Sequence, residues 1–295
     1  METKRLIVID SNALLHRAFH ALPPLTNKKG ELTGAVYGYL LTLFKAIKDL
    51  KPGYVVACFD TKAKTFRHEE YKEYKAHRVA TPDGIISQIP MAKEVLETFG
   101  VPIFARDGFE ADDLIATIAV KAEKEGAEVF ILSGDLDNLQ LVSDKIKVYT
   151  LGKGIRDTII YDAEKVKERF GVEPRQMIDF KALTGDPSDN VPGVPGIGKT
   201  TAAEIIQKYD NIENLYNELS TDTAVLKPKV KEALKANKEI AFLSRHLVET
   251  KKDVDIDFNL EHSEFGKFDI KKVEQKLIEL DFNSLIDKCQ ALLQK

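Results

Sequence analysis

Aspartates end three short apolar runs in this 295-residue chain. Asp10 ends RLIVID, Asp60 ends YVVACFD, and Asp135 ends EVFILSGD with Asp137 close behind. Apolar runs of this length are typical of buried strands. The carboxyl ends of parallel strands share one edge of a sheet, where ligands bind. A single strand-end aspartate is often only a helix N-cap, so it is the group of them that predicts a shared site.

Two further groups of acids extend this set. FEADD supplies Glu110, Asp112 and Asp113 at the expected start of a helix, and GDPSDN supplies Asp186 and Asp189 in a turn. Each group alone has a structural explanation, because the helix macrodipole favours acids at a helix start and turns are rich in aspartate. Adjacent carboxylates that enter an apolar helix nevertheless repel one another unless a cation neutralises them.

The chemistry of the whole set indicates hard divalent cations. No His or Cys accompanies the acids, and all-oxygen ligands select Mg²⁺ or Mn²⁺ over zinc. So many carboxylates suit two ions that together cleave a phosphodiester. The candidate metal ligands are Asp10, Asp60, Glu110, Asp112, Asp113, Asp135, Asp137, Asp186 and Asp189.

A glycine-rich segment, VPGVPGIGKTTAA, matches the G-x-x-x-x-G-K-[ST] pattern of P-loop nucleotide triphosphatases when read from Gly193. A P-loop follows a strand, whereas GDPSDNVP precedes this segment. Pro192 and Pro195 also lack the N–H groups that a phosphate nest needs. We therefore expect a hairpin between two helices that binds a phosphate of duplex DNA, through Gly193, Gly196, Gly198, Lys199 and Thr200. A P-loop triphosphatase is the alternative, which nucleotide binding would reveal.

A basic run, TKAKTFRHEEYKEYKAHR, begins directly after Asp60. Such a run usually lies on a solvated helix face, but its position beside the acids favours contact with nucleic acid. The net charge of −4 does not argue against DNA, because the acids are clustered and basic residues collect elsewhere.

The order of elements predicts an α/β domain followed by a helical one. Strands alternate with helices in the first part, which is typical of βαβ units and a mainly parallel sheet. A further strand is expected at 101–105, and helices are expected at 12–20, 36–50, 91–99 and 111–125. From about Pro174 short helices alternate with turns; a weakly alternating run at 254–258 and two helical segments after Phe268 complete the chain. No apolar run approaches the ~20 residues of a membrane span, and two cysteines without a pairing pattern indicate a reducing, cytoplasmic setting.

The acids, GDPSDN and the PGVPGIGKT segment together resemble the 5′ nuclease (flap endonuclease) superfamily, with the greatest likeness to the N-terminal 5′→3′ exonuclease domain of bacterial DNA polymerase I. The resemblance covers nearly the whole chain, including the tail LIELDFNSLIDKCQALL. It implies a mainly parallel central sheet flanked by helices (a PIN or resolvase-like nuclease core), a helical arch, and a smaller all-helical helix-hairpin-helix module. The implied domains are 1–172, with the arch at about 62–90, and 173–295, with a tail that packs back on the core.

The resemblance also implies roles for single residues. One metal would be held by Asp10, Asp60, Glu110 and Asp112. Asp113 would lie between the two sites. The second metal would be held by Asp135, Asp137, Asp186 and Asp189. The reacting phosphate would be contacted by Arg17, Arg67 and Lys75, and Tyr74 would stack on a base. The implied cofactors are two Mg²⁺ ions, for which Mn²⁺ can substitute, with K⁺ at the hairpin.

The function that the resemblance implies is a structure-specific 5′→3′ exonuclease and 5′-flap endonuclease in DNA replication, RNA primer removal and repair. Its expected partners are DNA with 5′ flaps, nicks or ends, and RNA primer strands. We expect a monomer in the bacterial cytoplasm, associated with the nucleoid, and fused to or working with a DNA polymerase. A DNA-binding module that has lost its chemistry is the other alternative, and the complete set of acids speaks against it.

Overall fold

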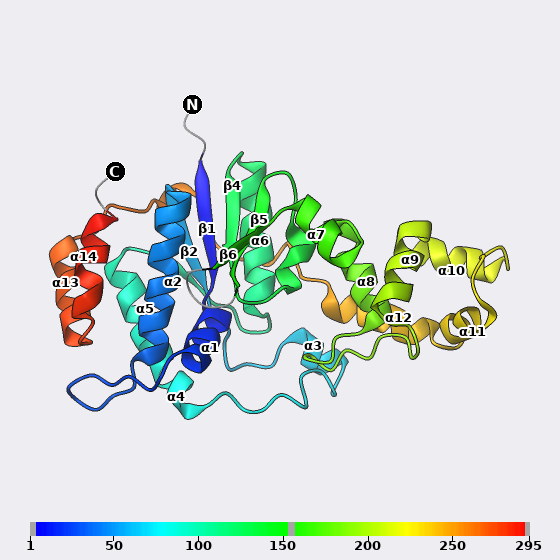
Figure 1. Ribbon diagram of the computed structural model, residues 1–295, viewed down its shortest axis with the longest axis horizontal. Coiled ribbons are helices and arrows are strands. Elements are labelled where there is room, and N and C mark those ends of the chain that lie inside the picture. The colour runs from blue at the N-terminus through cyan, green and yellow to red at the C-terminus, as the bar shows by residue number, and fades with distance from the viewer. Residues whose placement is uncertain (1–3, 153–156, 293–295) are drawn as a thin grey trace.

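The computed structural model describes residues 4–152 and 157–292. The outermost residues of the two predicted domains, 1–3 and 293–295, lie outside these ranges. A six-stranded sheet with the order β3-β2-β1-β4-β5-β6 forms the centre of the molecule (Figure 1). Its strands are β1 (Arg5–Asp10), β2 (Tyr54–Cys58), β3 (Ile103–Phe104), β4 (Glu128–Leu132), β5 (Ile146–Leu151) and β6 (Thr158–Tyr161). All neighbours pair in parallel except β5 and β6. The predicted mainly parallel α/β fold is confirmed.

Apolar layers cover both faces of the sheet, which is why its central strands are continuous apolar runs. In β1, Leu6 and Val8 face the layer that contains α6 (Ala111–Lys124). Ile7 and Ile9 face the opposite layer. That second layer is built from α1 (Ser11–Ala21), α2 (Gly34–Leu50) and α5 (Gln88–Thr98).

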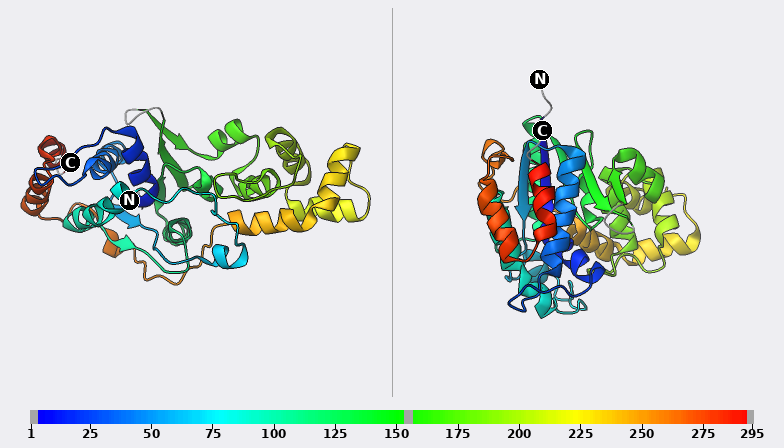
Figure 2. Two further views of the ribbon diagram at one scale, coloured as in Figure 1. Left: turned by 90° about the horizontal axis from the view of Figure 1, so that it is seen from below. Right: turned by 60° about the vertical axis from the view of Figure 1, so that its left-hand side comes forward.

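A helical module extends from one end of the sheet, beyond α7 (Ala163–Phe170) (Figures 1 and 2). It comprises α8 (Met177–Thr184), α9 (Lys199–Tyr209), α10 (Ile212–Ser220), α11 (Pro228–Ala236) and α12 (Lys238–Val248). After α12 the chain returns along an extended segment, residues 249–266, which we call the strap. It then forms α13 (Ile270–Glu279) and α14 (Asn283–Ala291), which pack on α5 and α2. No helix within the described ranges is long and apolar enough to cross a membrane.

The strap and two strands differ from what the sequence indicates. Residues 254–258 form no strand, because their backbone groups bond to side chains instead: Val254 N donates to Thr117 Oγ1, and Lys121 Nζ donates to Ile256 O. Sequence reasoning also missed β5 and β6. Both lie at one side of the sheet, and β6 is short and only partly buried.

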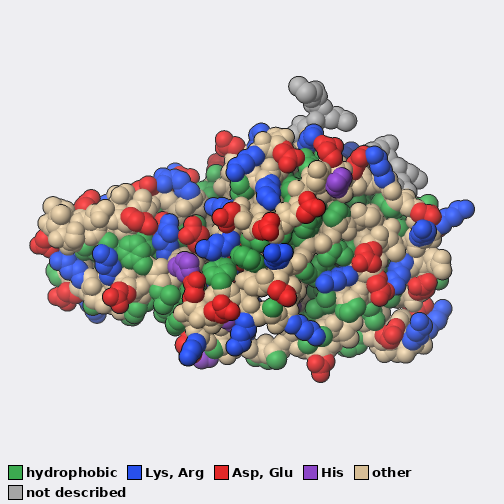
Figure 3. Space-filling model, turned by 180° about the vertical axis from the view of Figure 1, so that it is seen from behind, with side chains coloured by type: hydrophobic (Ala, Val, Ile, Leu, Met, Phe, Trp, Pro, Cys, Tyr) green, Lys and Arg blue, Asp and Glu red, His purple; other side chains and the backbone are tan. Residues whose placement is uncertain are grey.

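The segment that crosses the site, residues 61–87, is called the arch segment here. The expectation of a helical arch is largely wrong for it. It contains only two short helices, α3 (Phe66–Glu70) and α4 (Asp83–Ile86). Helix α3 ends before Tyr71, whose backbone is extended. Lys75 has a left-handed backbone conformation (φ 55°), which prevents a continuous helix, and Pro82 stands directly before α4. Seen from behind, a small opening separates the crossing chain from the body of the molecule (Figure 3).

Candidate active site

Asp10 lies where the sheet changes its direction of winding. It ends β1, which lies between β2 and β4, and ligands of open α/β sheets bind at such a position. Ala13 N donates to Asp10 Oδ1 over 3.1 Å, so Asp10 also caps α1. Ser133 Oγ donates to Asp10 Oδ2 over 2.6 Å. Burial raises the pKa of Asp10 to about 7, and the charges of Asp60 and Asp135 add to the rise.

The start of α6 and the end of β2 (Tyr54–Cys58) bring Glu110, Asp112 and Asp60 to this edge. Glu110 is the N-cap of α6, and Ala111 N donates to Asp60 Oδ1 over 2.7 Å. Asp112 accepts a hydrogen bond of 3.0 Å from Asn138 Nδ2. Burial raises the pKa of Asp112 well above its usual range, and repulsion from Asp10 and other nearby aspartates raises it further. The strand ends and the helix start therefore do converge, as the sequence suggested.

A lysine bridges the acids of the two parts of the chain. Lys181, on α8, bonds to Asp137 of the core and to Asp186 of the following turn, the latter at 2.8 Å. Burial raises the pKa of Asp137 to about 7 although Lys181 opposes the shift. Burial works in the same direction on Asp186, but the Lys181 ammonium brings its pKa down to about 2. Sequence reasoning missed Lys181; its position on the helix leading into GDPSDN was the available signal.

Basic residues of the arch segment cover the remaining acids. Lys75 Nζ lies 2.6 Å from Glu110 Oε1 and 3.6 Å from Asp189 Oδ2. Arg78 pairs with Asp189 and donates to Ser188 O over 3.2 Å. The arch segment also docks through its backbone, because Lys75 N donates to Asp189 O over 2.9 Å. Arg78 belongs to the basic run but received no role from the sequence.

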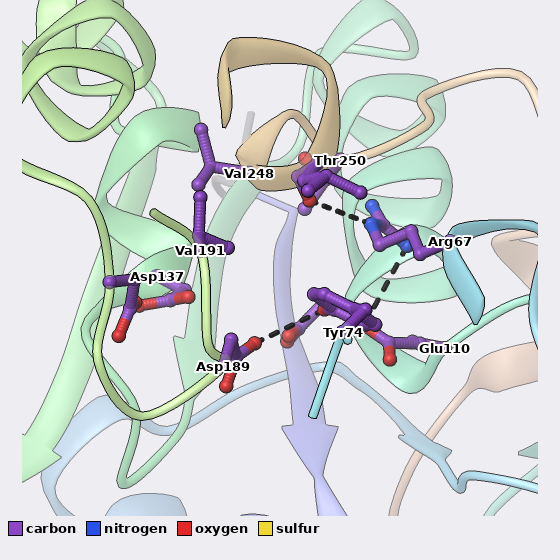
Figure 4. Close-up of a pocket in the computed structure, with 11 residues that line it drawn as sticks. Arg67, Tyr74, Glu110, Asp137, Asp189, Val191, Val248 and Thr250 are labelled. Atoms are coloured by element: carbon purple, nitrogen blue, oxygen red, sulfur yellow. Dashed lines mark hydrogen bonds and ion pairs between the residues drawn. The ribbon is translucent and has the colours of Figure 1, made fainter. Parts of the chain in front are cut away.

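Two predicted DNA contacts are buried and need correction. Tyr74 is 3% exposed and packs with Val191 and Leu247, so its ring offers no face to a base in this conformation. Its hydroxyl oxygen lies 3.0 Å from Glu110 Oε2 and 3.1 Å from Asp189 Oδ2, so its single proton is shared between these two acceptors (Figure 4). Arg67 is 2% exposed and is held by protein partners, so it cannot reach a phosphate as placed.

Arg17, another predicted phosphate contact, lies beside the acids. Its Nη2 donates to Gly152 O over 2.5 Å, and its side chain is half-buried. Together with Gly134 and Asp135 it lines an open pocket next to the carboxylates. A phosphate at this edge could therefore be approached by Arg17.

The glycine-rich hairpin is not a P-loop, since the described strands all end before α7 and α8 leads into the hairpin. Gly196 (φ 83°) and Gly198 have open space where a side chain would stand, and Lys199 and Thr200 begin α9 exposed. Gly193 is different: it is buried, and a Cβ there would lie 2.2 Å from Gly185 N. Its role is close packing of the backbone, and the predicted DNA contact through Gly193 is wrong.

The donor set fits hard divalent cations, with one exception. As placed across residues 4–152 and 157–292, however, no group of three or more Asp, Glu, His or Cys side chains is arranged so that it could hold a metal ion. Instead Lys75 and Lys181 neutralise part of the negative charge: Lys75 pairs with Glu110, and Lys181 pairs with Asp186. The exception is Asp113, which is fully buried and whose two oxygens accept four hydrogen bonds. The prediction that it ligates a metal conflicts with that saturation.

Comparison with known proteins gives two family matches that follow each other along the chain. The N-terminal resolvase-like domain of 5′-3′ exonucleases matches residues 5–171, and the C-terminal SAM fold of the same enzymes matches residues 172–271. A 5′-3′ exonuclease of Aquifex aeolicus is 39% identical over 99% of this chain and 97% of its own length. DNA polymerase I of Bacillus subtilis is 40% identical over 97% of this chain. The chain spans about a third (32%) of the length of that polymerase.

Solved structures share the fold. The D15 protein of T5, co-crystallised with metal ions, aligns over 98% of both chains with a TM-score of 0.70 and 21% identity. The bacteriophage T5 D15 flap endonuclease in a complex with DNA and metal ions aligns with a TM-score of 0.67 and 22% identity.

Proposed function

Because this chain belongs to the 5′-3′ exonuclease family, we propose that it hydrolyses phosphodiesters of DNA at 5′ ends and 5′ flaps with two divalent cations. The observation that carries the proposal is the convergence of buried carboxylates, which raise one another's pKa values, where the sheet changes its direction of winding and beneath a basic arch segment. Neither a P-loop triphosphatase nor a module without chemistry accounts for that convergence.

The acids divide between two cations. One is held by Asp10, Asp60, Glu110 and Asp112. The other is held by Asp135, Asp137, Asp186 and Asp189. Bound divalent cations supply activation of water and neutralisation of phosphate charge. We propose Mg²⁺ as the ion, with Mn²⁺ as a substitute, because all the donors are oxygens.

The chain's own cations handle the substrate. Lys75 and Arg78 lie over the carboxylates, and Arg17 flanks them. With cations on the acids, Lys75 and Arg78 would exchange their carboxylate partners for the substrate phosphate, whose charge increases in the transition state. The hairpin before α9 holds the duplex through Gly196, Gly198, Lys199 and Thr200, and its carbonyl groups would hold the K⁺ ion that we propose there.

The substrates that we propose are 5′ flaps, nicks and ends of DNA, together with RNA primer strands. We also propose that the protein acts in DNA replication and repair. We expect it to do so as a monomer in the bacterial cytoplasm, associated with the nucleoid. The similarity to DNA polymerase I supports fusion to, or cooperation with, a polymerase.

Single-turnover cleavage of a 5′-flap substrate tests the proposal. We expect Asp10→Asn to abolish cleavage in Mg²⁺ while flap binding in Ca²⁺ stays intact or tightens, because a negative charge beside the phosphates is removed. Asp255→Asn is the matched control, since its side chain is fully exposed. Cleavage by Asp10→Asn at the wild-type rate would rule out the metal-nuclease function. ATP hydrolysis that Lys199→Ala abolishes would favour the P-loop alternative.

A further inference from the structure

Arg67 and Asp113 form a fully buried, bidentate ion pair. Arg67 Nη1 lies 2.8 Å from Asp113 Oδ2, and Nη2 lies 2.9 Å from Oδ1. Asp113 also accepts from Glu110 N at 3.1 Å and from Lys251 N at 2.8 Å. Both oxygens of the carboxylate are thus fully used by protein donors, and none is left for a metal.

The guanidinium of Arg67 is likewise held by acceptors within the protein. Arg67 Nε donates to Leu247 O, and Nη2 donates to Glu249 O, each over 2.8 Å. Its one remaining N–H lies on the side of Glu110, whose Oε2 is 3.6 Å from Nη1. Protein acceptors thus hold four of the five N–H groups of Arg67, and its side chain is among the largest that are fully buried, so a phosphate cannot reach it as placed.

These bonds join three segments that are far apart in sequence. Arg67 belongs to α3 of the arch segment, Asp113 to α6 of the core, and residues 247–251 to the end of α12 and the start of the strap. Gln140 of the core adds to the same junction, since its Nε2 donates to Val248 O and its Oε1 accepts from Thr250 N. The end of α12 is thus bonded to the core on two sides.

Only α8 separates this junction from the turn that carries Asp186 and Asp189, two of the acids proposed for the second metal. α12 packs on α8, and α8 leads directly into the turn that carries Asp186 and Asp189. Val191, just after that turn, packs with Tyr74 and Leu247. A shift of α12 against the core would therefore move Asp186 and Asp189 relative to Asp137 and Glu110.

We propose that the Arg67–Asp113 pair is a positioning lock: it sets how the helical module docks on the core, and thereby the distance between the acids that the two parts contribute. Arg67 and Asp113 contact neither phosphate nor metal. The proposal rests on the proposed function, which it deepens, and it replaces the catalytic and metal-binding roles that the resemblance implied for these two residues.

The test is a double-mutant cycle with Arg67→Gln, Asp113→Asn and the double variant. Each single change leaves one buried charge without its partner, which is strongly destabilising, whereas a neutral hydrogen-bonded pair avoids that penalty. We expect each single variant to lower Tm in EDTA by roughly 5 °C or more. The double variant should melt above the less stable of the two single variants.

Cleavage below the melting range gives the second readout. The single variants should need more Mg²⁺ for half-maximal single-turnover cleavage, and the double variant should return toward the wild-type requirement. If Asp113 were a metal ligand and Arg67 a phosphate contact, the effects would add, as for independent sites, and the double variant would be the worst. That result would overturn the proposal.

Two further variants keep the test decisive. Arg67→Lys retains the positive charge but cannot reach Asp113 and both carbonyls together, so the lock predicts the same loss as for Arg67→Gln. Retained activity in Arg67→Lys would favour a phosphate contact and contradict the lock. Glu128→Gln breaks a partly buried pair with Arg5 at the opposite edge of the sheet, and it should lower Tm without changing the Mg²⁺ requirement. Absence of cleavage by wild-type protein would defeat the proposed function alone, because the Tm cycle still judges the lock.

Discussion

Asp10 is a single residue with two roles: it caps α1, and it lies among other carboxylates at the site. Its pKa of about 7 in the folded protein lies far above the value of 3.8 for a free aspartate. The folded state therefore binds more protons than the unfolded state between these values, and stability must fall as pH rises through that range. Divalent cations would offset the loss, since they take the place of protons.

This argument gives a pH-dependent prediction. In EDTA, wild-type protein should be less stable at about pH 8 than at about pH 5.5, by on the order of a few kcal/mol. Asp10→Asn has no charge to repel, so it should be more stable than wild type at the higher pH. Thermal melts of both proteins at the two pH values, with EDTA or with Mg²⁺, measure the effect. Equal pH dependence in both proteins would show that Asp10 is not the group responsible.

The hairpin before α9 is the element whose role is easiest to separate from chemistry. Its two open glycines and the exposed start of α9 suit contact with a backbone phosphate, and none of them lies among the acids. Binding and cleavage should therefore respond differently to changes in this element.

Lys199→Ala should weaken duplex binding and reduce the slope of log affinity against log salt by about 0.9, the value for one phosphate contact. Cleavage at saturating DNA should hardly change. Lys271→Ala on α13 is the control, because it removes an exposed lysine at the other end of the molecule. A salt slope identical to that of wild type would remove Lys199 from the DNA interface.

At the scale of the whole molecule, the chain leaves the core, builds the helical module and returns through the strap to α13 and α14 (Figure 1). Leu277 of α13 is fully buried in the layer that also contains α2 and α5. This layer lies across the sheet from α6, so the C-terminal helices stabilise the core without touching the acids.

Leu277→Ala should accordingly lower the free energy of unfolding by about 2–5 kcal/mol, through lost burial and the cavity that remains. At a temperature well below melting, flap cleavage should keep its rate. The neighbouring Ile278, 54% exposed, provides the control, since Ile278→Ala removes little buried surface. Denaturant unfolding and single-turnover cleavage test both statements, and a lost rate with intact folding would contradict them.

Features that depend on local order along the chain could be predicted from the amino-acid sequence alone. Period and turn residues place Asp10 and Asp60 after strands and Asp112 in the first turn of a helix, and the handedness and shortness of connections then bring them to one edge. The family and the mainly parallel sheet could be predicted for the same reason. The candidate metal ligands other than Asp113, and the domain boundary at 172–173, stay predictions.

The contacts between side chains from distant segments could not be predicted in this way. Arg67 belongs to a basic run that looks exposed, yet it pairs with Asp113 and with carbonyls about 180 residues away. Gly193 fits a phosphate-loop pattern, yet it packs against Gly185. Local periodicity carries no information about such partners, because burial and hydrogen bonding between distant segments exist only once the core and the helical module have docked.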